Sequence, residues 1–265
     1  MFRFALIALA AGIGAIASLG VAAAATTPPD LAREARWAQE VAPQVVVGDA
    51  TWLERSGRPR VLAILTEPTG AAKGAVVIVH GLGVHPDWAL IGELRTKLAD
   101  RGYATLAVQM PVLASDAPRE GYRDLYGEAG ERLAAAIAWL RAKGFAQVAI
   151  LSHSMGAMMT DAYLARRDAA PIVAWVPVGM LADFAAAPRM PVLDAIGEHD
   201  FPEVLAAAKV RAQRLRRDAC SSPLTMTGTD HYMNGATTAL AAAAATFFDR
   251  AFAGRCGGRD PVVGR

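Results

Sequence analysis

The sequence lacks the residue patterns that metal and nucleotide sites require. It has two cysteines, Cys220 and Cys256, and neither lies in a Cys-x-x-Cys pair. No His-Glu-x-x-His motif or acidic cluster is present, and the five histidines do not follow metal-ligand spacing. A Gly-x-Gly-x-x-Gly nucleotide loop is also missing from the first strand turns. We therefore expect a protein that uses no metal ion and no cofactor.

A strong charge of either sign is missing as well. The chain carries 27 Lys and Arg against 25 Asp and Glu, a formal net charge of +2, and the arginines are scattered through the predicted helices alongside acidic residues. Nucleic-acid binding proteins usually concentrate their basic residues in a stripe or patch. No nucleic-acid partner is expected.

The first residues resemble a secretory signal peptide. Met1-Phe2-Arg3 carries one positive charge, and the run 4–25 is apolar or small and ends in alanines. A retained membrane anchor is the alternative, but a spanning helix needs about 20 strongly apolar residues, and this run is mostly Ala and Gly. We expect cleavage near Ala25, export to the periplasm or the medium, and no stable membrane span afterwards.

The remaining residues 26–265 suit a single large α/β domain with its core at about 60–253. Export makes a disulfide between the two cysteines plausible, although two free surface thiols remain the alternative. The oligomeric state is left open by the sequence.

From residue 60 onward, short apolar β-rich runs alternate with longer Ala-rich stretches, which is typical of an α/β fold with a mostly parallel central sheet and helices on both faces. The predicted strands are 61–65, 75–79, 104–109, 147–152, 172–178, 191–196 and 223–227. The predicted helices are 88–101, 130–143, 155–167, 202–217 and 234–252. The segment 28–57 is interpreted as a helix and a leading strand at the domain edge, without an assigned function.

A candidate nucleophile lies where one strand meets a helix. The pentapeptide Ser152-His153-Ser154-Met155-Gly156 follows the apolar run 148–151 and precedes an amphipathic stretch, which is the context of a nucleophile elbow. Small residues are needed two positions either side of the serine, and Ser152 and Gly156 meet that need. An ordinary turn with Ser154 as a helix N-cap is the alternative.

An earlier strand ends in His80-Gly81-Leu82-Gly83, where a flexible backbone can turn its amides toward a developing oxyanion. The predicted donors are the N–H groups of Leu82 and Met155, the second at a helix N-terminus that favours negative charge. A simple tight turn is the alternative at His80-Gly81.

A nucleophilic serine needs a base and an orienting carboxylate, expected in the chain order Ser, Asp or Glu, His. Asp200 follows one late strand and His231 the next, so both emerge at the same edge of the sheet. Glu198, Asp183 and Asp194 compete with Asp200. Asp194 is interpreted as lying inside a strand and tied into the fold.

With these sites in order, residues 60–253 resemble the α/β-hydrolase superfamily. The stretches 80–88 and 102–113 are similar to the uncharacterised exported bacterial family known as domain of unknown function 3530, a resemblance that implies no substrate.

Candidate pocket residues are His85, Trp88, Gln109, Met110, Tyr122 and Tyr126. Trp88 could equally pack at a helix start, and the two tyrosines could lie in a surface loop. Only residues 179–189 separate two predicted strands, so we expect a minimal lid and an open site.

The sequence thus predicts a metal-free serine hydrolase that cleaves a small ester, thioester or related acyl substrate through Ser154, His231 and Asp200. A non-catalytic envelope-binding protein that retains the fold is the main alternative, because fold does not dictate function. A third alternative keeps the three residues but uses a non-ester substrate, as dehalogenases or peroxide-forming relatives do. A serine in place of an aspartate nucleophile disfavours the dehalogenase reaction.

Overall fold

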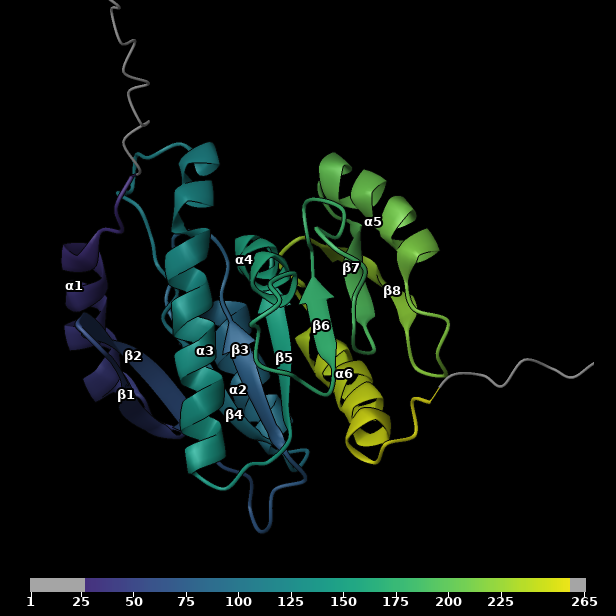
Figure 1. Ribbon diagram of the computed structural model, residues 1–265, viewed down its shortest axis with the longest axis horizontal. Helices are drawn as coiled ribbons and strands as arrows, with labels where there is room; N and C mark the ends of the chain where they lie inside the picture. The colour runs from purple at the N-terminus through teal and green to yellow at the C-terminus, as the bar shows by residue number, and fades with distance from the viewer. Residues whose placement is uncertain (1–26, 258–265) are drawn as a thin grey trace, which may run out of the picture.

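The computed structural model describes residues 27–257. The predicted signal peptide therefore lies outside the described residues. The chain alternates strands and helices around one sheet (Figure 1). The elements are α1 (Leu31–Val41), η1 (Ala42–Gln44), β1 (Asp49–Arg55), β2 (Arg58–Thr66), β3 (Ala75–Val79), α2 (Ala89–Ala99), β4 (Ala104–Val108), η2 (Arg119–Leu125), α3 (Tyr126–Ala142), β5 (Val148–His153), α4 (Met155–Leu164), β6 (Trp175–Val178), β7 (Leu193–His199), α5 (Pro202–Arg214), β8 (Ser222–Asp230) and α6 (Thr237–Phe252).

The eight strands of this sheet have the order β1-β2-β4-β3-β5-β6-β7-β8. The pairs β1–β2 and β2–β4 are antiparallel, and all later pairs are parallel. This arrangement confirms the predicted α/β fold with a mostly parallel sheet. The parallel strands end at the same edge, which is the upper edge in Figure 1, so the loops that follow them lie together there.

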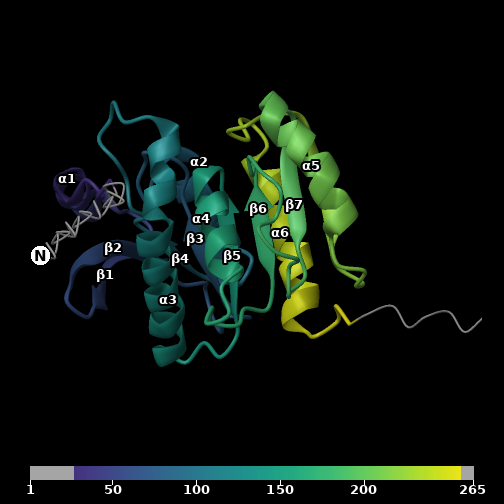
Figure 2. The same cartoon turned by 45° about the horizontal axis from the view of Figure 1, so that its top comes forward.

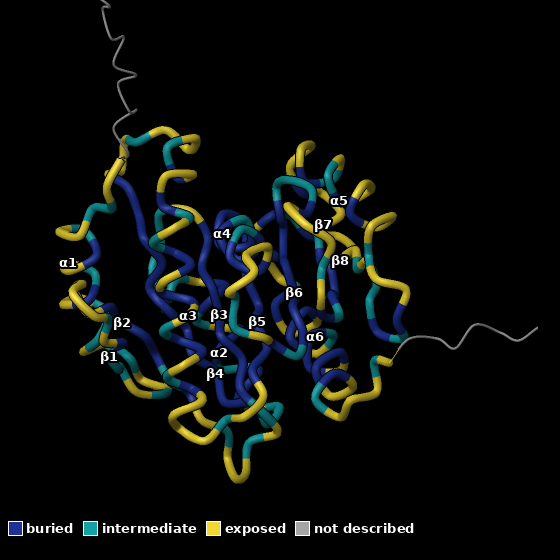
Figure 3. Tube along the Cα trace, viewed as in Figure 1, coloured by how far each residue is buried: buried dark blue, intermediate teal, exposed yellow. Residues whose placement is uncertain are grey.

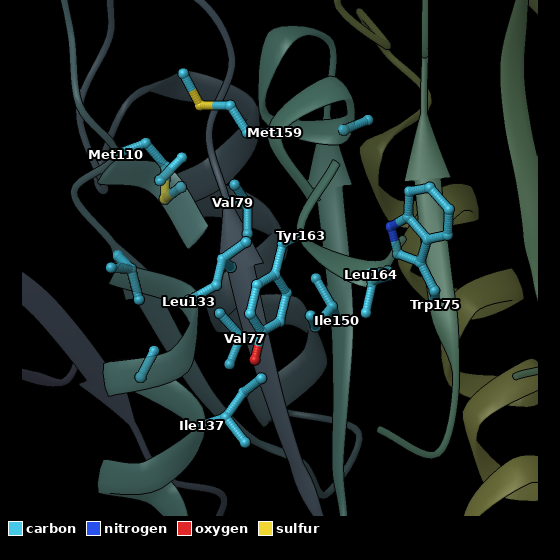
Figure 4. Close-up of a cluster of buried hydrophobic side chains, with 14 of the residues drawn as sticks. Val77, Val79, Met110, Leu133, Ile137, Ile150, Met159, Tyr163, Leu164 and Trp175 are labelled. Atoms are coloured by element: carbon cyan, nitrogen blue, oxygen red, sulfur yellow. The ribbon is translucent and has the colours of Figure 1, made fainter. Parts of the chain in front are cut away.

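Helices cover both faces of the sheet (Figure 2). Val77, Leu133, Ile137 and Tyr163 belong to the core between the sheet, α3 and α4, where their side chains gather (Figure 4). The neighbouring strand positions point the other way, and Ile78 packs with residues of α2 and α6. The central strands are therefore buried on both faces (Figure 3), which explains their continuous apolar sequences.

The predicted helices and strands are all present in the structure, but several of them begin or end at other residues than predicted. Helix α3 begins at Tyr126 rather than at residue 130, because its first turns pack into the fold: Ala129 and Gly130 are buried, and Glu128 pairs with Arg132 at 2.9 Å. Tertiary packing of this kind overrides the low helix propensity of the glycines. Helix α6 begins at Thr237 rather than at residue 234, since Gly235 has a positive φ of 73° that ends the preceding turn. The segment 28–57 forms α1 and β1 at the sheet edge, as predicted.

The structure pairs Cys220 with Cys256 in a disulfide, which resolves the alternative left open by the sequence. No helix within residues 27–257 has the length and apolar character needed to cross a membrane. Between β6 and β7 the chain forms bends and one isolated bridge, at Val192, but no helix, so the minimal lid expected from the sequence is confirmed.

Candidate active site

Ser154 occupies a strained turn between β5 and α4. Its backbone angles are φ 54° and ψ −123°, which side-chain-bearing residues rarely adopt. The turn is tight because α4 starts immediately against the end of β3: a Cβ on Gly156 would lie 2.2 Å from the carbonyl oxygen of His80. Only glycine fits there. The strained backbone directs the serine side chain toward the loops that follow β7 and β8.

Three side chains from three loops form one hydrogen-bonded chain. Nε2 of His231 lies 2.8 Å from Oγ of Ser154, and Nδ1 of His231 lies 2.6 Å from Oδ1 of Asp200. Because the carboxylate only accepts hydrogen bonds, Nδ1 carries the proton and Nε2 is free to accept from the serine hydroxyl. Ser154 is 9% exposed and His231 3% exposed, so these hydrogen-bonded side chains are shielded from bulk solvent, but a small part of Ser154 remains accessible.

The carboxylate of Asp200 is held in place by main-chain amides. The amide of Phe201 donates to Oδ1 at 2.8 Å, and the amide of Gly197 donates to Oδ2 at 3.2 Å. The competing carboxylates have other partners: Asp194 pairs with buried Arg211 at 2.9 Å, as expected for a residue tied into the fold. Glu198 accepts from the amide of Gly228.

Two aromatic rings fix the imidazole of His231. Phe201 stacks on it with ring centroids 4.2 Å apart, and His153 lies 4.9 Å away on centroids. Nε2 of His153 donates to the carbonyl oxygen of His231 at 2.9 Å. Burial lowers the pKa of His153 to about 4, so this ring is neutral at pH 7 and places no positive charge beside the imidazole of His231.

The loop after β3 is held by the buried side chain of His80. Its Nδ1 donates to the carbonyl of Gly81 at 2.9 Å, while its Nε2 accepts from the amide of Met110 at 2.8 Å. Burial lowers the pKa of His80 to about 3, which preserves this neutral tautomer. Neither of the two predicted oxyanion donors, the amides of Leu82 and Met155, bonds to a backbone carbonyl within residues 27–257.

A cavity of 300 Å³ opens above Ser154. It is mostly apolar, with Arg119 as its charged wall residue. Its lining consists of Gly81, Leu82, Val84, Trp88, Arg119, His153, Ser154, Met155, Leu181, Phe201, His231 and Tyr232. Ser154 and His231 therefore face a space that can hold a small molecule, and both predicted oxyanion donors border it.

Of the six predicted pocket residues, Trp88 alone lines this cavity, from the N-cap position of α2. The other five lie outside its lining. Gln109, Met110 and Tyr122 are buried, because the chain after β4 turns into the core. His85 packs edge-on against Trp37. Tyr126 borders an adjacent hollow of 210 Å³ that shares Arg119, Met155 and Leu181 with the cavity.

Sequence reasoning missed several wall residues of the cavity, among them Arg119, Leu181, Phe201 and Tyr232. Phe201 and Tyr232 immediately follow Asp200 and His231 in the chain, so adjacency to the predicted partners could have identified them. Arg119 and Leu181 carry no comparable signal, because their loops reach the cavity only through the fold. A larger groove of 510 Å³ lies between α1 and β2 and includes none of the three hydrogen-bonded residues.

Two family models match the chain. The model described as protein of unknown function (DUF3530) matches residues 6–125, and the model of the alpha/beta hydrolase family matches residues 76–263. The first covers α1, the β1–β2 hairpin and the loops after β3 and β4, whereas the second includes Ser154, Asp200 and His231. No curated protein matches the chain.

Solved structures share the fold. The chain is similar to a dienelactone hydrolase from Anabaena variabilis (23% identity, 77% of this chain and 97% of that one, TM-score 0.63). It is also similar to Est1E from Butyrivibrio proteoclasticus (16% identity, 78% of this chain and 99% of that one, TM-score 0.62). A third similar structure is XC6422 from Xanthomonas campestris, a serine hydrolase without a lid (15% identity, 77% of this chain and 95% of that one, TM-score 0.60). At these identities the likeness concerns the fold, but the second family model spans more than half of the sequence. The chain belongs to the alpha/beta hydrolase family.

Proposed function

We propose that this protein is a serine hydrolase that cleaves an ester, thioester or related acyl bond through an acyl-enzyme. The observation that carries the proposal is the continuous hydrogen-bonded chain from Ser154 through His231 to Asp200, which starts on a strained turn and faces a cavity. An isolated N-cap serine would need neither the strain nor the two partners.

In the proposed reaction, Nε2 of His231 accepts the proton of Ser154 as Oγ attacks the substrate carbonyl. Asp200 keeps the imidazole in the required tautomer and stabilises its charged form. The amides of Leu82 and Met155 bind the oxyanion, the second aided by the N-terminus of α4. His231 then protonates the leaving group, and a water molecule activated by the same base releases the acyl group from Ser154.

The size of the cavity supports a small substrate. A volume of 300 Å³ with mostly apolar walls suits an acyl or aryl group better than a long lipid. Trp88, Phe201 and Tyr232 form an aromatic wall with edge-on ring contacts. One similar solved structure, of Est1E, holds ferulic acid, which fits an aromatic ester as one substrate class for this site.

The signal-peptide pattern of residues 1–25 supports the further proposal that the enzyme acts outside the cytoplasm. The disulfide between Cys220 and Cys256 agrees with an oxidising compartment. Fusion of residues 1–30 to a periplasmic reporter tests export: secretion of the reporter supports it, and retention in the cytoplasm contradicts it.

The function is tested by the hydrolysis of p-nitrophenyl esters from acetyl to octanoyl. The wild type should turn over the short esters best, and Ser154→Ala should lose at least about 10⁴-fold in kcat/KM. Ser115→Ala, at an exposed loop serine, serves as the control and should match the wild type. A Ser154→Ala variant as active as the wild type would contradict the proposal, and a folded wild type without turnover would favour the non-catalytic binding protein.

A further inference from the structure

Helix α1, which precedes the sheet in the chain, is tied to the loops that border the cavity. It lies at the sheet edge beside β1 and β2 (Figure 1). The guanidinium of Arg33 donates to the carbonyl of Gly83 at 3.0 Å and to the carbonyl of Leu113 at 2.8 Å. Gly83 belongs to the loop after β3 and Leu113 to the loop after β4. The ring of Trp37, 4.5 Å below the guanidinium carbon, fixes the side chain from its own helix.

A second tie runs through the interior. Glu34 of α1 pairs with buried Arg132 of α3 at 2.8 Å, and Arg132 donates to the carbonyl of Gln109 at 3.1 Å. The side-chain amide of Gln109 lies 3.1 Å from Nε2 of His80. His80 in turn holds the carbonyl of Gly81. A polar chain therefore links α1 to the oxyanion loop, residues 80–84.

These two ties fix the oxyanion loop on both sides of Leu82. In a trans peptide the C=O and N–H groups point in opposite directions, so the hydrogen bond from His80 to the carbonyl of Gly81 also orients the amide of Leu82. The bond from Arg33 to Gly83 holds the next residue, whose φ is +69°. Leu82 itself is 41% exposed. The direction of its amide thus depends on the anchors at its neighbours.

We propose that Arg33 is a positioning residue for the reaction and that α1 holds the oxyanion loop in its catalytic geometry. The proposal rests on the proposed function, because it assigns the amide of Leu82 to the oxyanion. It gives a role to the N-terminal segment, which lies apart from the nucleophile, the base and the orienting carboxylate in the sequence. Arg33 uses both arms of its guanidinium on loop carbonyls, so its loss frees two loops at once.

The test compares Arg33→Ala with Arg36→Ala in the chain that starts at Thr26. Arg36 lies on the same helix but is exposed, which makes it the matched control. Arg33→Ala should lower kcat for a p-nitrophenyl ester by about 100-fold, with KM changed by less than about threefold, because a misplaced oxyanion donor acts on the transition state. Methylguanidinium added to Arg33→Ala should restore part of the lost kcat, whereas it should not affect Arg36→Ala.

Hydrogen exchange of the peptide that contains residues 80–85 gives a readout that needs no activity. Exchange should be faster in Arg33→Ala than in the wild type and unchanged in Arg36→Ala. If Arg33→Ala does not fold, Arg33→Lys, which can reach one carbonyl, should show an intermediate kcat and intermediate exchange. Wild-type kcat and wild-type exchange in a folded Arg33 variant would overturn the proposal. If the wild type itself lacks turnover, the proposed function fails, and the exchange result still decides whether α1 holds the loop.

Discussion

Gly179 directly follows β6 and packs against the imidazole of His231. Its φ is +61°, and a Cβ at this position would lie 2.9 Å from Cε1 and 3.0 Å from Nδ1 of His231. It would also lie 3.4 Å from Oδ2 of Asp200. The substitution Gly179→Ala therefore pushes on the ring that joins the nucleophile to the carboxylate, without removing any of the three side chains.

Two effects of Gly179→Ala can be separated. A side chain at positive φ costs about 1–2 kcal/mol, which lowers the melting temperature by roughly 2–8 °C in a domain of this size. The contact with His231 must also be relieved, because 2.9 Å is shorter than real Cβ contacts. A shift of the ring by a few tenths of an ångström stretches both hydrogen bonds, and we expect kcat to fall by about 10- to 100-fold.

Gly57→Ala is the matched control for this experiment. Gly57 has a φ of +66° in the β1–β2 turn, and a Cβ there meets nothing within 4 Å. Both variants should lose the stability that a positive φ costs in thermal unfolding, with a further loss in Gly179→Ala from its contact with His231, but only Gly179→Ala should lose kcat with a p-nitrophenyl ester. If Gly179→Ala keeps wild-type kcat, the imidazole of His231 is not held where the reasoning places it.

Three further predictions concern stability. Burial raises the pKa of Asp161 to about 6, so the folded state binds the proton more tightly than the unfolded state and stability falls as the pH rises from about 4 to 6. Asp161→Asn should consequently raise the melting temperature more at pH 7.5 than at pH 4.5, and an equal shift at both would refute this. Asp194→Ala leaves the buried guanidinium of Arg211 without its carboxylate and should cost about 3–5 kcal/mol in urea unfolding, whereas a loss below about 1 kcal/mol would contradict the burial argument. The disulfide between Cys220 and Cys256 closes a loop with a sequence separation of 36 residues, so the double variant Cys220→Ser, Cys256→Ser should be about 4 kcal/mol less stable than the wild type. Reductant should destabilise the wild type and leave the double variant unchanged, and a wild type that reductant does not affect would argue against the disulfide.

The sheet was predictable because its strands carry their own signal. Buried parallel strands need apolar residues on both faces, so runs such as 75–79 stand out, and the predicted bounds match β3. Element ends were less predictable because they depend on partners far along the chain. Strand β7 continues to His199, beyond its apolar run, because its last residues pair with β8 up to Asp230.

The three hydrogen-bonded residues were easier to predict from the sequence than the walls of the cavity. Ser154, Asp200 and His231 each follow a strand, and parallel strands deliver their ends to one edge, so order along the chain was enough to bring them together. Whether a residue lines the cavity depends on the direction of its side chain, and its position in the sequence does not determine that direction. Gln109 and Met110 also follow a strand, yet both are buried because the chain turns inward there to bond with His80.

The most direct test of the account is covalent labelling of the nucleophile. The chain that starts at Thr26 is incubated with a fluorophosphonate probe, and the modified residue is identified by mass spectrometry of its peptides. The account predicts one label, on Ser154, that is lost in Ser154→Ala and retained in Ser115→Ala. A folded wild type that takes no label, or a label that persists in Ser154→Ala, would contradict it.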